Sequence, residues 1–270
     1  MTESQRTHAM TQRRIVVAPA RPCRRSTFTY SAGEIDVHRP LHTPADVPLP
    51  AVLFVTGYPD PGFLRRMGCL QKDMESYVSW AELVASAGLA AVTYSNGRPE
   101  DVGTVLSHLD GHGARYGIDT ARLGVWACSG NAPAALGLLR RTTIHPGLRC
   151  AVLCYPYLLD LDGTIDVADA ARTWGFANPL AGTQIGDLRS DVRLSIVRAG
   201  RDEMPGLNAS LDRFVVAARG AGLSVELVDH ADAPHAFDLS DASATTRAVI
   251  DGVVEFFRRH LTGGREARSG

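Results

Sequence analysis

The sequence RLGVWACSGNAPAA, residues 122–135, joins a short apolar run to a run of helix formers. Residues 123–128 have the composition of a buried strand, residues 132–141 favour a helix, and Ser129 stands at the junction. A strand, sharp turn and helix of this kind hold a serine on a strained bend, with a backbone N–H directly behind its hydroxyl. The stretch therefore predicts an elbow that presents Ser129 above a sheet.

The residues two before and two after Ser129 bear on this interpretation, because strand and helix approach closely there and small side chains are needed. Ala127 is small, whereas Asn131 stands where the usual pattern has glycine. A serine that follows a buried strand is also a common helix N-cap. The stretch alone leaves both interpretations open.

Strands alternate with helices from residue 51 onward. The pattern predicts strands at 51–55, 89–94, 123–128, 150–155, 194–199 and 225–228, and helices at 74–87, 99–116, 132–141, 207–219 and 242–260. Such alternation is typical of an α/β fold, with a mostly parallel twisted sheet and helices on both faces. Residues 26–30 and 34–38 flank a Ser-Ala-Gly turn and predict an antiparallel hairpin at one edge.

Composition excludes several classes of protein. The 270 residues are 45% hydrophobic and 21% charged, with a formal net charge of -1, so neither a nucleic-acid nor a membrane partner is expected. The five cysteines are scattered and lack metal-site spacing, which predicts reduced thiols, a cytoplasmic location and no metal. No phosphate-binding loop is found, so we expect no cofactor.

One segment does not fit the alternation, which suggests how the chain divides. Residues 158–191 exceed what a crossover needs, and we expect them to form a small cap over the carboxyl ends of the strands, with a helix near 165–173. An ordinary surface excursion is the alternative. Residues 26–262 then form the domain, residues 1–25 a flexible N-terminal extension, and residues 263–270 a flexible tail.

Two later strand ends offer partners for the serine. A serine hydroxyl needs a histidine to take its proton and a carboxylate to fix that histidine. Asp202 follows the strand at 194–199, and His235 lies in the loop after the strand at 225–228. This order of serine, acid and histidine is the order that such a sheet uses, so we predict a catalytic triad of Ser129, Asp202 and His235.

Alternatives exist for two of the three positions. Cys128 adjoins Ser129, but as the nucleophile it would put the bulky Trp126 two residues before the bend. Asp160 or Asp162, which follow the preceding strand, could replace Asp202 as the acid.

Acyl transfer also needs backbone donors where negative charge develops on oxygen. The N–H of Gly130 lies directly after the nucleophile, and the N–H of Tyr58 lies in the loop after the strand at 51–55. These two groups are the predicted oxyanion hole. The expected lining of the substrate pocket is apolar apart from one amide: Tyr58, Phe63, Asn131, Trp174 and Phe176.

From residue 26 to residue 261 the chain resembles the α/β-hydrolase superfamily, and within it the dienelactone-hydrolase-like and acyl-ester-hydrolase groups. The motifs that carry the likeness are GYPDPG at 57–62, WACSGN at 126–131, VRAGRDEMPGLN at 197–208 and PHAFD at 234–238. The resemblance implies an α/β-hydrolase fold with the nucleophile at Ser129. Dienelactone hydrolases proper carry a cysteine nucleophile, so the serine argues against that assignment.

The expected function is that of a serine hydrolase which cleaves a carboxylic ester or thioester of a small-molecule acyl substrate. The same site would also serve an acyltransferase, a lactone-forming enzyme or another non-hydrolytic biosynthetic enzyme. A non-catalytic binding protein on a hydrolase fold is the third alternative, although a binding role does not need all three triad residues. The oligomeric state is left open, a homodimer included.

Overall fold

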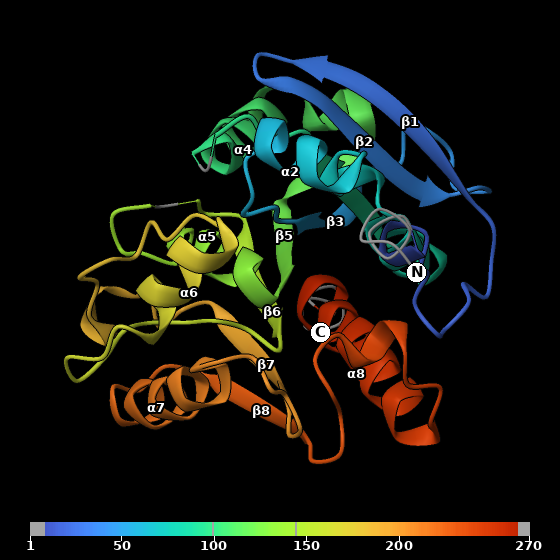
Figure 1. Cartoon of the computed structure of the whole chain (residues 1–270). Helices are drawn as coiled ribbons and strands as arrows, with labels where there is room; N and C mark the ends of the chain where they lie inside the picture. Colours follow the sequence, from blue (N-terminus) through green and yellow to red (C-terminus); the bar gives the residue numbers. More distant parts are fainter. Residues whose placement is uncertain (1–8, 99, 144, 264–270) are drawn as a thin grey trace, which may run out of the picture.

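The computed structural model describes residues 9–98, 100–143 and 145–263. Its strands form one eight-stranded sheet with the order β1-β2-β4-β3-β5-β6-β7-β8 (Figure 1). Strands β1 and β2 form an antiparallel hairpin, β2 pairs antiparallel with β4, and the remaining neighbours are parallel. The strands are β1 (Cys23–Tyr30), β2 (Gly33–Pro40), β3 (Leu49–Phe54), β4 (Ala90–Tyr94), β5 (Ile118–Cys128), β6 (Leu148–Cys154), β7 (Arg193–Ala199) and β8 (Val225–His230). The predicted α/β sheet with its antiparallel edge is therefore confirmed.

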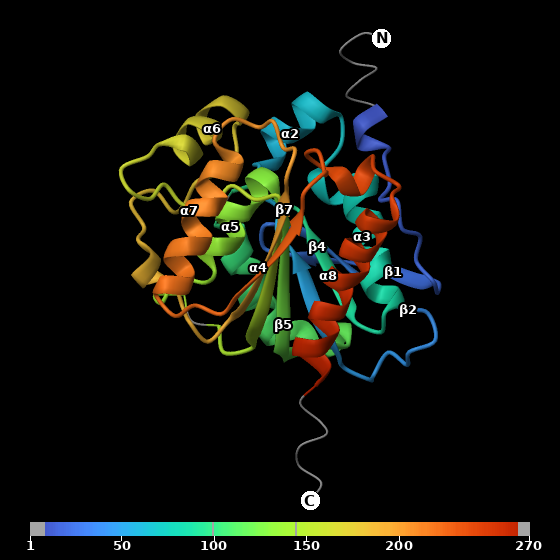
Figure 2. The ribbon, with the colours of Figure 1, turned by 90° about the horizontal axis from the view of Figure 1, so that it is seen from below.

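Helices cover both faces of the sheet. They are α2 (Asp60–Met67), α3 (Glu75–Ser86), α4 (Asp101–His112), α5 (Ala132–Gly137), α6 (Asp166–Trp174), α7 (Leu207–Gly220) and α8 (Ala244–Thr262), with short 3₁₀ turns η1 (Gln71–Asp73), η2 (Gly113–Tyr116), η3 (Ser129–Asn131), η4 (Ile185–Asp187) and η5 (Phe237–Leu239). Figure 2 shows α4, α5 and α7 on one face and α3 and α8 on the other. A hydrophobic core lies on each face of the sheet, and successive strand residues point to opposite faces. Val125 and Ala127 therefore pack in the core under α4, α5 and α7, whereas Trp126 packs in the core under α3 and α8.

Helix α2 was not predicted, because residues 57–62 are dense in turn formers. Two of those residues start the helix instead: Pro59 is its N-cap, and Pro61 lies in its first turn, where the missing N–H costs nothing. Gly68 ends α2 in the left-handed conformation, and its N–H donates to the Leu64 carbonyl.

The described part of the N-terminal segment, residues 9–25, is docked on the domain, where the sequence suggested a flexible or loosely docked extension. Ile15 is buried and donates its N–H to Ser79 Oγ at 3.1 Å, and Val16 donates its N–H to the Asp238 carbonyl at 2.9 Å. Arg14 forms ion pairs with Glu75 and Glu82 on α3. Residues 1–8 and 264–270 of the predicted extension and tail lie outside the described residues.

The segment 158–191 contains the expected helix, α6, which lies together with α2 at one end of the sheet (Figure 2). Asp160 anchors the start of α6, since its two carboxylate oxygens accept the N–H groups of Val167 and Ala168 at 2.8 and 2.9 Å. The buried face of α6 packs against Tyr157, Phe176 and Leu207. None of the helices in the described ranges has the length and apolar character that crossing a membrane requires.

Candidate active site

The backbone at the end of β5 is strained where the sequence predicts an elbow. Ser129 has φ = 51°, a left-handed conformation that is unusual for a residue with a side chain. Residues in such conformations persist only where their surroundings hold them, and they cluster at functional sites. Here the Ser129 carbonyl accepts the N–H of Tyr157 at 3.3 Å, which ties the bend to the segment that follows β6.

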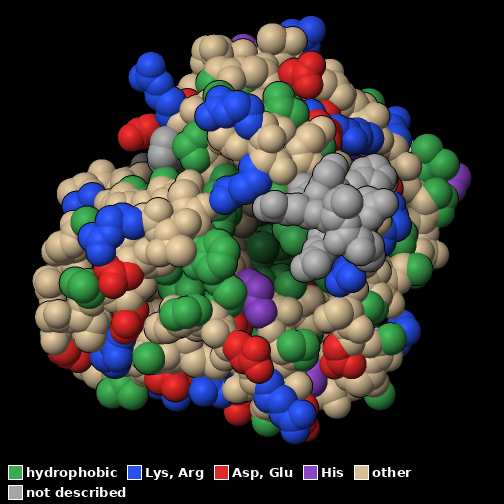
Figure 3. Space-filling model, in the orientation of Figure 1, with side chains coloured by type: hydrophobic (Ala, Val, Ile, Leu, Met, Phe, Trp, Pro, Cys, Tyr) green, Lys and Arg blue, Asp and Glu red, His purple; other side chains and the backbone are tan. Residues whose placement is uncertain are grey.

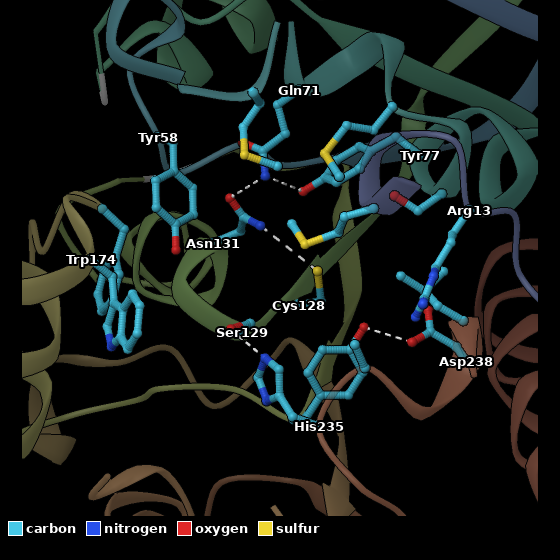
Figure 4. Close-up of a pocket in the computed structure, with 18 of the residues that line it drawn as sticks. Arg13, Tyr58, Gln71, Tyr77, Cys128, Ser129, Asn131, Trp174, His235 and Asp238 are labelled. Carbon is cyan, nitrogen blue, oxygen red and sulfur yellow. Dashed lines mark hydrogen bonds between the residues drawn. The ribbon is translucent and has the colours of Figure 1, made fainter. Parts of the chain in front are cut away.

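The structure brings the three predicted triad side chains together. Ser129 Oγ lies 3.0 Å from His235 Nε2 (Figure 4). His235 Nδ1 in turn lies 2.6 Å from Asp202 Oδ2. The Asp202 side chain is fully buried, and its other oxygen accepts the Met204 N–H at 2.9 Å. A carboxylate only accepts hydrogen bonds, so it keeps the imidazole proton on Nδ1 and leaves Nε2 free to accept the serine proton.

The alternative residues are placed differently. Both oxygens of Asp160 are occupied at the start of α6, and Asp162 is exposed on a left-handed turn. Burial, together with the charge of the nearby Asp238, raises the pKa of the Cys128 thiol to about 12. Since the thiolate is the nucleophilic form, Cys128 is held as an unreactive thiol at neutral pH.

The loop after β3, residues 55–58, is bound to its surroundings through its backbone. Because the sequence predicts an oxyanion donor at Tyr58, we call this segment the oxyanion loop. The partners on the N–H side are the Trp126 carbonyl for Val55, Tyr94 Oη for Thr56 and Asn131 Oδ1 for Gly57. The loop carbonyls also accept hydrogen bonds. The Val55 carbonyl accepts one from Tyr77 Oη, and the Gly57 carbonyl accepts one from the Ala177 N–H. The carbonyls of Thr56 and Tyr58 both accept from Asn96 Nδ2. Among the described residues, the Tyr58 N–H is the one backbone group of this loop without a partner.

This loop lies directly against the elbow. A Cβ atom on Gly57 would stand 2.8 Å from the Gly130 carbonyl oxygen and 2.9 Å from Asn131 Cα. A Cβ atom on Gly130 would stand 2.7 Å from Tyr58 Oη and 2.5 Å from the Phe176 ring. Both positions therefore require glycine, and the close approach puts Tyr58 and Gly130 on adjoining segments beside Ser129.

Comparisons with known proteins give the fold its name. No family model and no curated protein matches the chain. Solved structures do match: a fungal esterase from Rhizomucor miehei has a TM-score of 0.68 at 15% identity, covering 97% of this chain and 89% of its own. The esterase LipW from Mycobacterium marinum has a TM-score of 0.64 at 19% identity, covering 94% and 85%. This chain has the α/β-hydrolase fold. An ester hydrolase from the metagenome of Lake Arreo, solved with a bipyridine phosphonate derivative, is similar at a TM-score of 0.68 and 16% identity, covering 96% and 88%.

A cavity of about 490 Å³ opens beside Ser129 and His235 on this α/β-hydrolase scaffold. Hydrophobic side chains gather in the hollow that Figure 3 shows. All five residues that the sequence suggested for the pocket line it, namely Tyr58, Phe63, Asn131, Trp174 and Phe176. Burial raises the pKa of both Tyr58 and Tyr157 to about 12, so these phenols are uncharged at neutral pH.

Sequence reasoning missed several residues of the cavity wall. Met10 and Arg13 reach it from the docked N-terminal segment, and Tyr77 and Trp80 reach it from α3. Side chains this far from the motifs carry no signal in a single sequence, because the fold alone brings them to the cavity.

Asp238, the last residue of the PHAFD motif, is a buried carboxyl group at the cavity. It accepts hydrogen bonds from Trp80 Nε1 at 2.7 Å and from Tyr155 Oη at 2.8 Å. Burial raises its pKa, while the two hydrogen bonds oppose that shift. The Tyr155 ring meets the His235 ring edge-on with a centroid distance of 5.0 Å, so Asp238 supports one side of the triad histidine through Tyr155.

Within the described ranges, no group of three or more His, Cys, Asp or Glu side chains is arranged to hold a metal ion.

Proposed function

We propose that this protein is a serine hydrolase that cleaves a carboxylic ester through an acyl-enzyme. The observation that carries the proposal is the chain of contacts from Ser129 Oγ through His235 to the buried Asp202. These three side chains meet at a strained elbow beside an apolar cavity, which is the arrangement that nucleophilic acyl transfer needs.

The steps follow from this geometry. His235 Nε2 takes the proton as Ser129 Oγ attacks the ester carbonyl, and the carbonyl oxygen becomes an oxyanion near the N–H groups of Tyr58 and Gly130. The intermediate collapses, and His235 returns its proton to the departing alcohol. Water then attacks the acyl-enzyme with His235 again as the base, which releases the acid and restores the Ser129 hydroxyl.

The cavity favours an uncharged, apolar group on the substrate. Its volume of about 490 Å³ lies within the range of small-molecule sites, and its walls are mainly aromatic and aliphatic. The esterase names of the structural neighbours are consistent with an ester substrate. A thioester uses the same acyl chemistry, so substrate assays should include both classes.

The test compares the wild type with Ser129→Ala on p-nitrophenyl esters and acyl thioesters of increasing chain length. We expect turnover by the wild type and a loss of at least about 1000-fold in the variant, because the nucleophile is removed. The melting temperature should be unchanged. A fluorophosphonate probe should label the wild type at Ser129 and leave the variant unlabelled. Full activity in Ser129→Ala would end the triad hypothesis, and a folded wild type that neither reacts nor labels would favour a binding protein.

A further inference from the structure

Asn131 stands two residues after Ser129, where the family pattern has glycine, and its side chain is buried at 3% exposure. Its Oδ1 atom accepts two hydrogen bonds. One comes from the Gly57 N–H at 2.7 Å, and the other from Gln71 Nε2 at 3.0 Å (Figure 4). The Gly57 N–H can only donate, so the Asn131 atom that faces it must be the oxygen. The unusual side chain is thus bound to the oxyanion loop.

Further hydrogen bonds connect Asn131, through Gln71 and Tyr77, to a second residue of the oxyanion loop. Gln71 Nε2 also donates to Tyr77 Oη at 3.2 Å, and the Tyr77 hydroxyl donates to the Val55 carbonyl at 3.2 Å. Both amide protons of Gln71 and both lone pairs of Asn131 Oδ1 are therefore used. Four groups from η3, η1, α3 and the oxyanion loop form one buried chain of hydrogen bonds.

These hydrogen bonds hold the peptide unit that precedes the one carrying the Tyr58 N–H. The peptide unit before Gly57 is held at both ends, its carbonyl by Asn96 Nδ2 at 2.8 Å and its N–H by Asn131. In the following unit, the Gly57 carbonyl accepts the Ala177 N–H at 2.8 Å. Because C=O and N–H point in opposite directions in a trans peptide, this second contact directs the Tyr58 N–H away from Ala177.

We propose that Asn131 and Gln71 are positioning residues that fix the orientation of the oxyanion loop, so that the Tyr58 N–H is aligned before substrate binds. This inference rests on the proposed hydrolase function. The glycine usual at position 131 would remove the acceptor of the Gly57 N–H and so loosen the peptide unit that precedes Tyr58. Preorganised donors stabilise the oxyanion only if they are aligned when charge develops, so a loosened loop reduces kcat more than KM.

The test is a kinetic comparison of the wild type with Asn131→Ala, Gln71→Met and the double variant. Loss of a whole oxyanion donor costs about 100- to 1000-fold in kcat, so a misaligned donor should cost about 10- to 100-fold. We expect KM to change by no more than about threefold, because the cavity wall is otherwise kept. The double variant should be little worse than Asn131→Ala, since both changes break the same chain.

Asp119→Ala is the matched control. Asp119 lies on β5, at the end of that strand far from the elbow, and its carboxylate also accepts a backbone N–H, that of Ala121 at 3.0 Å. This variant should lose thermal stability and keep the wild-type kcat. An unchanged kcat in Asn131→Ala, or an equal loss in Asp119→Ala, would overturn the inference.

Amide hydrogen exchange separates this inference from the proposed function. The Gly57 N–H should exchange at least about tenfold faster in Asn131→Ala than in the wild type, since its acceptor is gone. Unchanged exchange would refute the contact whether or not the protein hydrolyses esters. If the wild type hydrolyses no ester while Gly57 exchange responds as expected, the proposed function fails and the contact stands.

Discussion

The triad and the oxyanion loop adjoin each other but are held in different ways. Each triad residue follows a different strand, β5, β7 or β8, and the three are joined by side-chain hydrogen bonds. The oxyanion loop is held through its backbone by partners from six places: Tyr77, Tyr94, Asn96, Trp126, Asn131 and Ala177. A single change should therefore disable the triad, whereas changes around the loop should have graded effects.

The largest effect after loss of the nucleophile is expected for Asp202→Asn. The new amide can still accept the Met204 N–H, so the fold should be kept, but it no longer holds the proton on His235 Nδ1. Such a change lowers kcat by about 10,000-fold in a serine triad. Steady-state kinetics and a thermal melt measure the two consequences.

Asp160→Asn is the control for the acid, because Asp160 caps α6. It should lower the melting temperature and leave kcat within about threefold, as expected for a weakened helix cap. If Asp160→Asn were as inactive as Asp202→Asn, the acid would be assigned wrongly and the distinction between triad and loop would fail.

Gly57→Ala tests the other half of the comparison. The added methyl group would press against the Gly130 carbonyl and Asn131 Cα and so push the oxyanion loop away from the elbow. We expect kcat to fall by about 10- to 100-fold, a smaller loss than for a triad residue. Gly62→Ala is the matched control: the nearest atom to its added methyl group is 4.0 Å away, so activity should be kept. Equal activity of the two variants would show that the loop tolerates displacement.

The same contrast explains what a single sequence can predict. Ser129, Asp202 and His235 each follow a recognisable strand, so their meeting could be inferred from strand order. Tyr58 and Gly130 were inferred from their places beside strand ends, although an amide leaves no mark in the sequence. Asn131 stood out as a departure, but its partners Gly57 and Gln71 are 74 and 60 residues away and have no pattern in common with it. The docking of Ile15 and Val16 depends on contacts of the same distant kind.

Trp174→Ala tests the segment 158–191, where neither a triad residue nor the oxyanion loop is changed. Trp174 lines the cavity and is 42% exposed, and its carbonyl accepts Arg66 Nη1 at 3.1 Å. Removal of the indole should raise KM for long-chain esters by about three- to tenfold, because apolar contact is lost, and leave kcat unchanged. Ile165→Ala removes an exposed apolar side chain just before α6 that is not among the residues lining the cavity, and it should not change KM. Equal effects of the two variants would mean that the segment 158–191 influences KM only through its stability.

The smallest effect is expected at Cys128, the neighbour of Ser129, and it sharpens the assignment of the nucleophile. Burial raises the pKa of Cys128 to about 12, so the fraction of Cys128 that is thiolate at pH 8 is roughly one in ten thousand. A thiol with the ordinary pKa of 9.0 would be about one-tenth thiolate at this pH. Iodoacetamide at pH 8 should therefore leave ester hydrolysis intact, and peptide mapping should find Cys69 alkylated before Cys128. A raised pKa favours the neutral thiol, so labelling of Cys128 should increase only as the pH approaches 12. Rapid alkylation of Cys128 with parallel loss of activity at pH 8 would instead make Cys128 a competitor for the role of Ser129.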